Sequence, residues 1–212
     1  WTANKQGSSL LRSVAYGNGY WVAVGGGGTL YYKAGTPEGT WTANKQGSSL
    51  LRSVAYGNGY WVAVGGGGTL YYKAGTPEGT WTANKQGSTY LSDVAYGNDY
   101  WVAVGDSGTL YYKAGTPGGT WTANKQGSSN LRIVAYGNGY WVAVGESGTL
   151  YYKAGTPEGT WTANKQGSSL LRSVAYGNGH WIVVGPSGTL YYKVKTLPAI
   201  ALDGTYAYIR AK

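Results

Sequence analysis

Residues 10–45 read LLRSVAYGNGYWVAVGGGGTLYYKAGTPEGTWTANK, and this stretch decides the fold. It holds two β-prone runs, residues 12–16 and 20–24, on either side of Gly17-Asn18-Gly19. Asn-Gly between two such runs is a strong hairpin signal, because a type I′ turn needs positive φ at both central residues. The two runs are therefore expected to pair as an antiparallel hairpin.

Two more strands are predicted within the same stretch. Gly25 to Gly28 turns the chain into a third run at residues 29–33. Residues 34–39, which contain Pro37, form a longer turn before a fourth run at residues 40–45. Short runs separated by Gly, Pro and Asn are typical of an antiparallel meander. One unit is thus predicted to be a four-stranded sheet.

The unit occurs five times, beginning at Trp1, Trp41, Trp81, Trp121 and Trp161. Four strands in a repeat of this length is the pattern of a β-propeller blade. The run at residues 20–24 is apolar on both faces, as expected for a sheet with a neighbouring sheet on each side. A parallel β-solenoid is the alternative, but it has no need for an Asn-Gly hairpin in each unit. The predicted fold is all-β, a five-bladed β-propeller with four antiparallel strands per blade.

The phase of the repeat predicts how the ring closes. The chain begins within a fourth strand, and the fifth unit ends after Lys193 without one. We expect Trp1 to Lys5 to supply that strand, so that the N-terminal strand completes the last blade and no sheet edge stays open. The propeller then spans residues 1–194. Residues 195–212 form a C-terminal tail, in which Asp203-Gly204 predicts a short hairpin.

Composition narrows the class of protein. The sequence has 38 Gly, 22 Tyr and 10 Trp, and it has no Cys. A Cys-free chain has no disulfide framework and no thiolate chemistry. No apolar run is long enough to span a membrane, so membrane insertion is not expected. The absence of Met indicates that the chain belongs to something longer. Monomeric rings are favoured.

A formal net charge of +9 comes mainly from Lys5, Arg12 and Lys33 with their copies. The plainest interpretation is a solvated surface that keeps the protein soluble. A basic ring that attracts an anionic glycan or cell-wall polymer is the functional alternative. Nucleic acid is not an expected partner, since the sequence has no basic run and no aromatic-basic RNA motif.

The run Val-Ala-Tyr-Gly-Asn-Gly-Tyr-Trp-Val-Ala-Val-Gly, followed by Gly-Thr-Leu-Tyr-Tyr and Gly-Thr-Trp-Thr, resembles propeller repeats of phage-tail and bacterial surface proteins. It is also similar to the Asp-box repeats of sialidases and to the propellers of photosystem II assembly factors. The resemblance covers residues 1–194. The Asp-box match is degenerate, because residues 34–41 keep the Gly-x-Trp end but contain no Asp. The resemblance implies a propeller on a virion, a phage tail or an extracellular surface, and it does not define an activity.

Catalysis is not expected from this sequence. Its acidic residues are Glu38, Glu78, Asp93, Asp99, Asp106, Glu146, Glu158 and Asp203. Glycoside hydrolysis needs two carboxyl groups facing across the bond, and only Asp93 and Asp106 lie in one unit in a way that suggests such a pair. His180 is the only histidine, so neither a metal site nor a catalytic triad is predicted. We expect no enzyme activity, no metal and no cofactor.

Differences between units point to one rim of the ring. Most of them fall just before the first strand, within it, or in the turn after the second strand. These regions share one face in a propeller. We interpret that face as a ligand-binding surface, against the alternative of drift at exposed positions. The predicted contacts are Gln6, Ser9, Leu10, Arg12, Arg52, Tyr90, Asp93, Asp106, Asn130, Arg132, Glu146 and Arg172.

The predicted function is non-enzymatic, lectin-like recognition of cell-envelope glycans by a phage-tail or bacterial surface protein. Trp21 and Trp41 are expected in the core between blades. A first alternative is a structural or assembly scaffold that binds protein, since Leu10, Leu50 and Tyr90 with Leu170 would form an apolar patch on the same rim. A second is an engineered or amplified repeat protein without a selected ligand, because the units are so alike.

Overall fold

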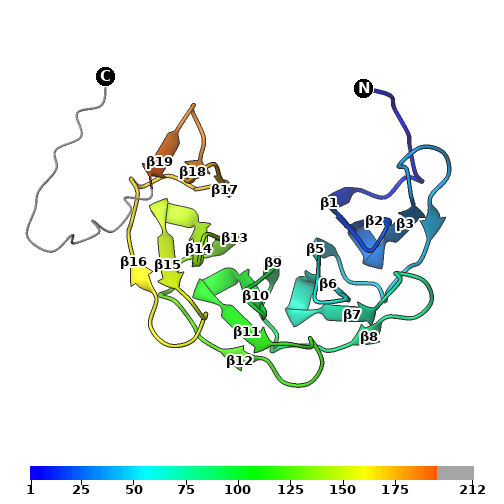
Figure 1. Ribbon diagram of the computed structural model, residues 1–212, viewed down its shortest axis with the longest axis horizontal. Coiled ribbons are helices and arrows are strands. Elements are labelled where there is room, and N and C mark those ends of the chain that lie inside the picture. The colour runs from blue at the N-terminus through cyan, green and yellow to red at the C-terminus, as the bar shows by residue number, and fades with distance from the viewer. Residues whose placement is uncertain (195–212) are drawn as a thin grey trace, which may run out of the picture.

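The computed structural model describes residues 1–194, which form five antiparallel sheets arranged as an open arc (Figure 1). Four sheets have four strands each, in the order of the chain, and the fifth has three. The first strand of each sheet lies on the inside of the arc and the last lies on the outside (Figure 1). The predicted all-β repeat of four-stranded antiparallel sheets is confirmed for the first four units.

The strands follow one pattern in the first four units, with a long first strand and a very short fourth strand, and the fifth unit has three strands of equal length. The first sheet contains β1 (Leu11–Gly17), β2 (Tyr20–Gly25), β3 (Leu30–Ala34) and β4 (Thr42–Ala43). The second contains β5 (Leu51–Gly57), β6 (Tyr60–Gly65), β7 (Leu70–Ala74) and β8 (Thr82–Ala83). The third contains β9 (Leu91–Gly97), β10 (Tyr100–Gly105), β11 (Leu110–Ala114) and β12 (Thr122–Ala123). The fourth contains β13 (Leu131–Gly137), β14 (Tyr140–Gly145), β15 (Leu150–Ala154) and β16 (Thr162–Ala163), and the fifth contains β17 (Ser173–Gly177), β18 (His180–Val184) and β19 (Leu190–Val194).

The turns have the geometry that their residues predict. Asn18 and Gly19 have φ values of 47° and 78°, as a type I′ hairpin between β1 and β2 requires. After β2 a single 3₁₀ turn leads into β3, and its Gly28 has φ 74°. A Cβ at Gly28 would overlap the carbonyl oxygens of Gln46 and Gly47, so this turn also fits tightly against the connection to the next unit.

The hydrophobic core lies between sheets. Each of the first three interfaces repeats the same contacts: two valines and a leucine of one sheet pack on a leucine, a valine, an alanine and two tryptophans of the next. Between the first two sheets these residues are Val22, Val24, Leu30, Leu51, Val54, Ala63, Trp61 and Trp81. Trp61 is fully buried and Trp81 nearly so. The prediction of tryptophans in the core between blades is confirmed for the copies at these interfaces, whereas Trp21 and Trp41 themselves, on the first sheet, are half-buried and outside these clusters.

The first and fifth sheets do not meet in this structure. Their facing apolar side chains are exposed: Val14 of β1 is 58% exposed, whereas Val54 at the same position of β5 is 5% exposed. Leu190 of β19 is 56% exposed, whereas Leu110 of β11 is 1% exposed. The described chain is therefore an arc with two uncovered apolar ends (Figure 1).

The expected pairing of Trp1 to Lys5 with the fifth sheet is absent here, and that sheet ends at β19. The segment is instead held against the first sheet. Asn4 Nδ2 donates to the carbonyl oxygens of Pro37 and Gly39, at 3.0 and 2.8 Å. Asn44 makes the same two bonds to the second sheet. The N-terminal segment therefore lies against the first sheet in the way that the segment containing β4 lies against the second sheet. The hairpin predicted in the C-terminal tail lies outside the described residues.

Candidate functional site: an arginine-lined axial pocket

The inner strands β1, β5, β9 and β13 bring their second and third residues to the centre of the arc, and Leu170 and Arg172 join them from just before β17. A pocket of about 510 Å³ opens there. It is lined by Arg12, Ser13, Arg52, Ser53, Ser92, Asp93, Arg132, Ile133, Leu170 and Arg172. The structure thus gathers five of the twelve predicted contacts, all four arginines and Asp93, around one cavity. Four guanidinium groups against one carboxyl group make it a basic pocket.

The four arginines differ in their partners. Arg132 pairs with Asp106 at 3.3 Å and with Glu146. The Arg52 guanidinium lies over the Tyr90 ring, 5.7 Å from its centroid. Arg12 and Arg172 are exposed, and within residues 1–194 neither has a charged or aromatic partner. Arg12, Arg52 and Arg172 therefore carry positive charge that no carboxylate neutralises within residues 1–194, and Arg12 and Arg172 are the two without any charged or aromatic partner.

Asp93 is the acidic exception in the pocket. Its carboxylate accepts hydrogen bonds from Ser53 Oγ at 2.6 Å and from the Val134 amide at 2.9 Å. Ser13 occupies the same repeat position in the first unit, and its Oγ accepts a hydrogen bond from the Val54 amide. The side chain at this position therefore links one inner strand to the next. Although part of the residue reaches the cavity, desolvation raises the pKa of Asp93 to about 6, against the opposing effect of these hydrogen bonds.

Ser92 takes the place that arginine has in the other units. Its residue is 3% exposed, and its Oγ has no hydrogen-bond partner among residues 1–194. A buried hydroxyl without a hydrogen-bond partner costs free energy. Ser92 and Asp93 therefore give one side of the pocket a shorter side chain and a more acidic lining than the rest.

A second group of predicted contacts forms a network on the rim above Arg132. Asn130 Nδ2 donates to Glu146 at 3.0 Å, and Asn130 Oδ1 accepts from the Ser107 amide at 2.8 Å. The hydrogen bond from Arg132 is the main cause of a lowered pKa of the Glu146 carboxyl group, and the hydrogen bond from Asn130 lowers it further. Asp106, Asn130 and Glu146 each differ from the residues at the same position in the other units, and Asp106 and Glu146 are the two acceptors that Arg132 contacts.

The remaining predicted contacts lie elsewhere. Gln6, Ser9 and Leu10 line a separate, open depression at the N-terminal connection. Gln6 Oε1 accepts from the Trp41 amide at 3.0 Å, and Gln46 makes the same bond to Trp81, so this glutamine holds a strand in place. Leu10 is exposed, whereas its counterparts Leu50, Tyr90 and Leu170 are half-buried.

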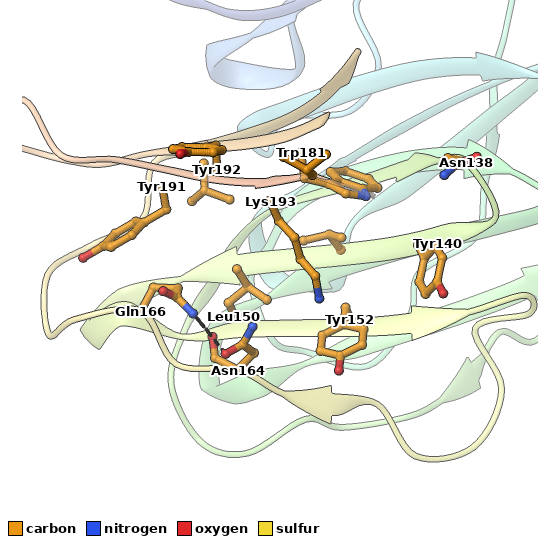
Figure 2. A pocket seen from close by; sticks show the side chains of 13 residues that line it. Asn138, Tyr140, Leu150, Tyr152, Asn164, Gln166, Trp181, Tyr191, Tyr192 and Lys193 are labelled. Atoms are coloured by element: carbon orange, nitrogen blue, oxygen red, sulfur yellow. Dashed lines mark hydrogen bonds between the residues drawn. The ribbon is translucent and has the colours of Figure 1, made fainter. Parts of the chain in front are cut away.

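A third cavity, of about 460 Å³, lies between the fourth and fifth sheets. None of the contacts predicted from the sequence lines it. Figure 2 shows it between the strand that carries Leu150 and Tyr152 and the strand that carries Tyr191, Tyr192 and Lys193. The missing fourth strand of the fifth unit was the sequence signal that could have located this groove. We call it the edge groove.

Residues 1–194 contain no cluster of three or more side chains suited to a metal ion. His180 Nδ1 lies 2.6 Å from the Asn178 carbonyl oxygen in the same hairpin. Among these residues we also find no helix with the length and apolarity that crossing a bilayer demands.

The sequence matches no protein-family model and no curated protein sequence. Solved structures do match its fold. The computationally designed Ika8 protein aligns with a TM-score of 0.68 and 13% identity over 87% of this chain. The WD40 β-propeller domain of Doa1 aligns with a TM-score of 0.66 and 13% identity over 90% of this chain. The chain spans 58% and 66% of those two chains. These likenesses establish the repeat β-propeller fold and nothing finer.

Proposed function

We propose that this repeat β-propeller is a non-catalytic binding module that recognises an acidic cell-envelope glycan at the surface of a bacterium or on a phage tail. The observation that carries the proposal is the convergence of four arginines on one axial pocket. Arginine presents a planar fork of donors that matches carboxylate, sulfate and phosphate groups. An acidic sugar is a ligand that carries such a group on a polar ring.

Within the pocket the arginines have different tasks. Arg12 and Arg172 are free to pair with the acidic group of the ligand, and Arg52, held over Tyr90, adds a third positive charge beside an aromatic face. Arg132 is already neutralised by Asp106 and Glu146. Ser92 and Asp93 offer hydrogen bonds to sugar hydroxyls on the opposite side. The charge asymmetry fixes the direction in which an acidic sugar enters.

The test is binding to an array of acidic and neutral envelope polysaccharides, followed by calorimetry on the hits. Arg12→Ala with Arg172→Ala should weaken the binding of an acidic ligand by about a hundredfold or more, because each lost charge-assisted pair is worth about 1.5–3 kcal/mol. Lys73→Ala with Lys113→Ala is the matched control, since it removes the same charge from strands that do not line the pocket. If both double variants lost the same binding affinity, net charge alone would explain the effect. That result would contradict a specific site.

A protein-binding scaffold is the second candidate. It is favoured by exposed Leu10 on the rim, flanked by half-buried Leu50, Tyr90 and Leu170. Leu10→Ser should then abolish capture of the partner protein without changing glycan binding. An array without hits, together with a partner lost in this variant, would favour the scaffold.

We also propose the finer part of the predicted fold, a ring of five blades closed by Trp1 to Lys5. It requires the first sheet to move onto the fifth, where β19 would pair with the N-terminal strand. Elsewhere Tyr32 pairs with Thr42, so Tyr192 should pair with Thr2. The Cys-free chain allows a direct test with Thr2→Cys and Tyr192→Cys. At high dilution, oxidation should give a cross-link within one molecule, as it should for the control pair Tyr72→Cys and Thr82→Cys.

A further inference from the structure

The third unit reverses the charge of its wall of the axial pocket. In the first, second and fifth units an arginine is followed by a serine, as at Arg12-Ser13, whereas the third unit has Ser92-Asp93. Both changes act in the same direction, because the first removes a positive charge and the second adds a negative charge. Ser92 and Asp93 both line the pocket, so the charge of this wall changes from +1 to −1.

The Asp93 carboxylate is held in place by the two neighbouring inner strands. Ser53 Oγ of β5 donates to Oδ1 at 2.6 Å, and the Val134 amide of β13 donates to Oδ2 at 2.9 Å. An ionised carboxylate can accept about four hydrogen bonds, so this one retains acceptor capacity for a group in the pocket. The residue is half-buried and lines the cavity, so it is not sealed between the strands.

The negative charge of Asp93 has no counter-ion in this structure. Four arginines line the same pocket, yet within residues 1–194 none of them forms an ion pair with Asp93. On β13, Arg132 is paired with Asp106 and Glu146, and on β5, Arg52 lies over an aromatic ring. A partly desolvated carboxylate is costly unless a positive charge or further donors compensate it. A bound ligand can supply that positive charge.

The positive and negative walls lie on different sides of the pocket. Asp93 belongs to β9, which is in the middle of the arc and is the inner strand furthest from both ends (Figure 1). Arg12 in β1 and Arg172 just before β17 lie at the two ends, and neither has a charged or aromatic partner among residues 1–194. The pocket is therefore dipolar. Its volume of about 510 Å³ is in the range that holds one small ligand.

We propose that this pocket selects a zwitterionic sugar, one that carries an ammonium group in addition to its acidic group. The ammonium group binds the Asp93 carboxylate at the middle of the arc, and the acidic group binds Arg12 and Arg172. A hydroxyl group can also donate to Asp93, but only a cation offsets its charge. The inference rests on the proposed function, which it narrows from acidic glycans in general to those with a free amine.

Calorimetry with two hexose phosphates tests this selection. Glucosamine 6-phosphate carries both charges, and glucose 6-phosphate has a hydroxyl group in place of the amine. The protein should bind glucosamine 6-phosphate about tenfold more tightly, which is the usual advantage of a charged donor over a neutral donor. Asp93→Ser, which restores the residue of the first, second and fifth units, should remove this preference. It should weaken the binding of glucosamine 6-phosphate and strengthen that of glucose 6-phosphate, and the second effect also shows that the variant is folded.

Asp99→Gly is the matched control. It also removes one carboxylate and restores the residue of the other units, but it does so in a hairpin turn that does not line the pocket. This variant should keep the tenfold preference. A preference lost equally in Asp93→Ser and Asp99→Gly would mean that net charge causes it, which would overturn the proposal.

NMR of the Asp93 carboxyl carbon as a function of pH gives a readout that a structural role alone would not move. Glucosamine 6-phosphate should lower the pKa of Asp93, because a nearby cation favours the ionised form. Glucose 6-phosphate should raise it, because a nearby anion disfavours that form. A change in the same direction with both sugars would contradict contact between the ammonium group and Asp93.

The zwitterion and the acidic-glycan site fail in different ways. Equal affinity for the two sugar phosphates, with both weakened by Arg12→Ala and Arg172→Ala, would overturn the zwitterion and leave the acidic-glycan site intact. A preference that persists in Asp93→Ser would overturn the zwitterion too. If neither sugar phosphate binds, the zwitterion is again overturned, and the polysaccharide array decides the proposed function by itself.

Discussion

The interior of the arc and its two ends are built from the same residues in different surroundings. Val94 and Val134 are buried between sheets, while Val14 at the same repeat position is exposed. Trp121 is nearly fully buried, while Trp1 at the same repeat position is fully exposed. The residue types of a unit do not by themselves make a core, because each sheet buries its apolar faces only against a neighbour. Substitutions at equivalent positions should therefore have unequal effects.

The largest contrast is expected between two tryptophans. Trp121→Ala should lower the free energy of unfolding by about 3–5 kcal/mol, the usual cost of emptying a buried aromatic site. Trp1→Ala should change it by less than about 0.5 kcal/mol if the arc stays open, as is usual for an exposed side chain, and by an amount similar to Trp121→Ala in the closed ring proposed above. Guanidinium unfolding followed by circular dichroism measures both. A large loss in Trp1→Ala would mean that Trp1 is buried in solution, and hence that the ring closes.

A second contrast concerns Asp93, for which no other unit has a carboxyl group at this position. Because the folded pKa is raised to about 6, the protonated form stabilises the fold. The contribution of Asp93 to stability should be fully present below about pH 4 and should fall by about 2–3 kcal/mol as the pH rises through 6. Asp93→Asn should abolish this dependence, and Asp99→Asn, in an exposed turn, should not. Unfolding curves at several pH values decide the matter, and a profile that is identical in Asp93→Asn would contradict the assignment.

The smallest contrast compares two glycines at the end of a first strand. A Cβ at Gly97 would overlap the Tyr136 ring of the next sheet, so Gly97→Ala should destabilise the protein by about 1–3 kcal/mol. Gly177 has no neighbour within 4 Å among the described residues. Gly177→Ala should therefore stabilise the protein by about 0.4–1 kcal/mol, because it restricts the unfolded chain. Thermal unfolding at low protein concentration gives both values, and a destabilised Gly177→Ala variant would place Tyr16 over this glycine.

The sequence was sufficient for local structure. The Asn18-Gly19 hairpin, the turn after the second strand and the four-strand unit follow from residues that are adjacent in the chain, where φ requirements and alternation act directly. The buried tryptophans between sheets were predictable for the same reason: their apolar area has to be covered, and only another unit can cover it.

The axial pocket was predictable in its composition and not in its pairing. A ring of arginines interrupted at Ser92 follows from the repeat, but the stacking of Arg52 on Tyr90 and the neutralisation of Arg132 depend on side-chain positions in neighbouring units. Closure depends on rotation between sheets. Small differences in packing angle add up around the arc, and no single residue reports that sum.

The equivalence of the interfaces has a consequence for how such proteins change in length. Each unit meets its neighbour through the same pair of surfaces, so inserting or deleting one whole unit adds or removes one junction and leaves both termini chemically as they were. A duplication in the gene therefore alters the diameter of the propeller and the number of arginines that face its centre. The two end surfaces that have to meet on closure keep the same residues.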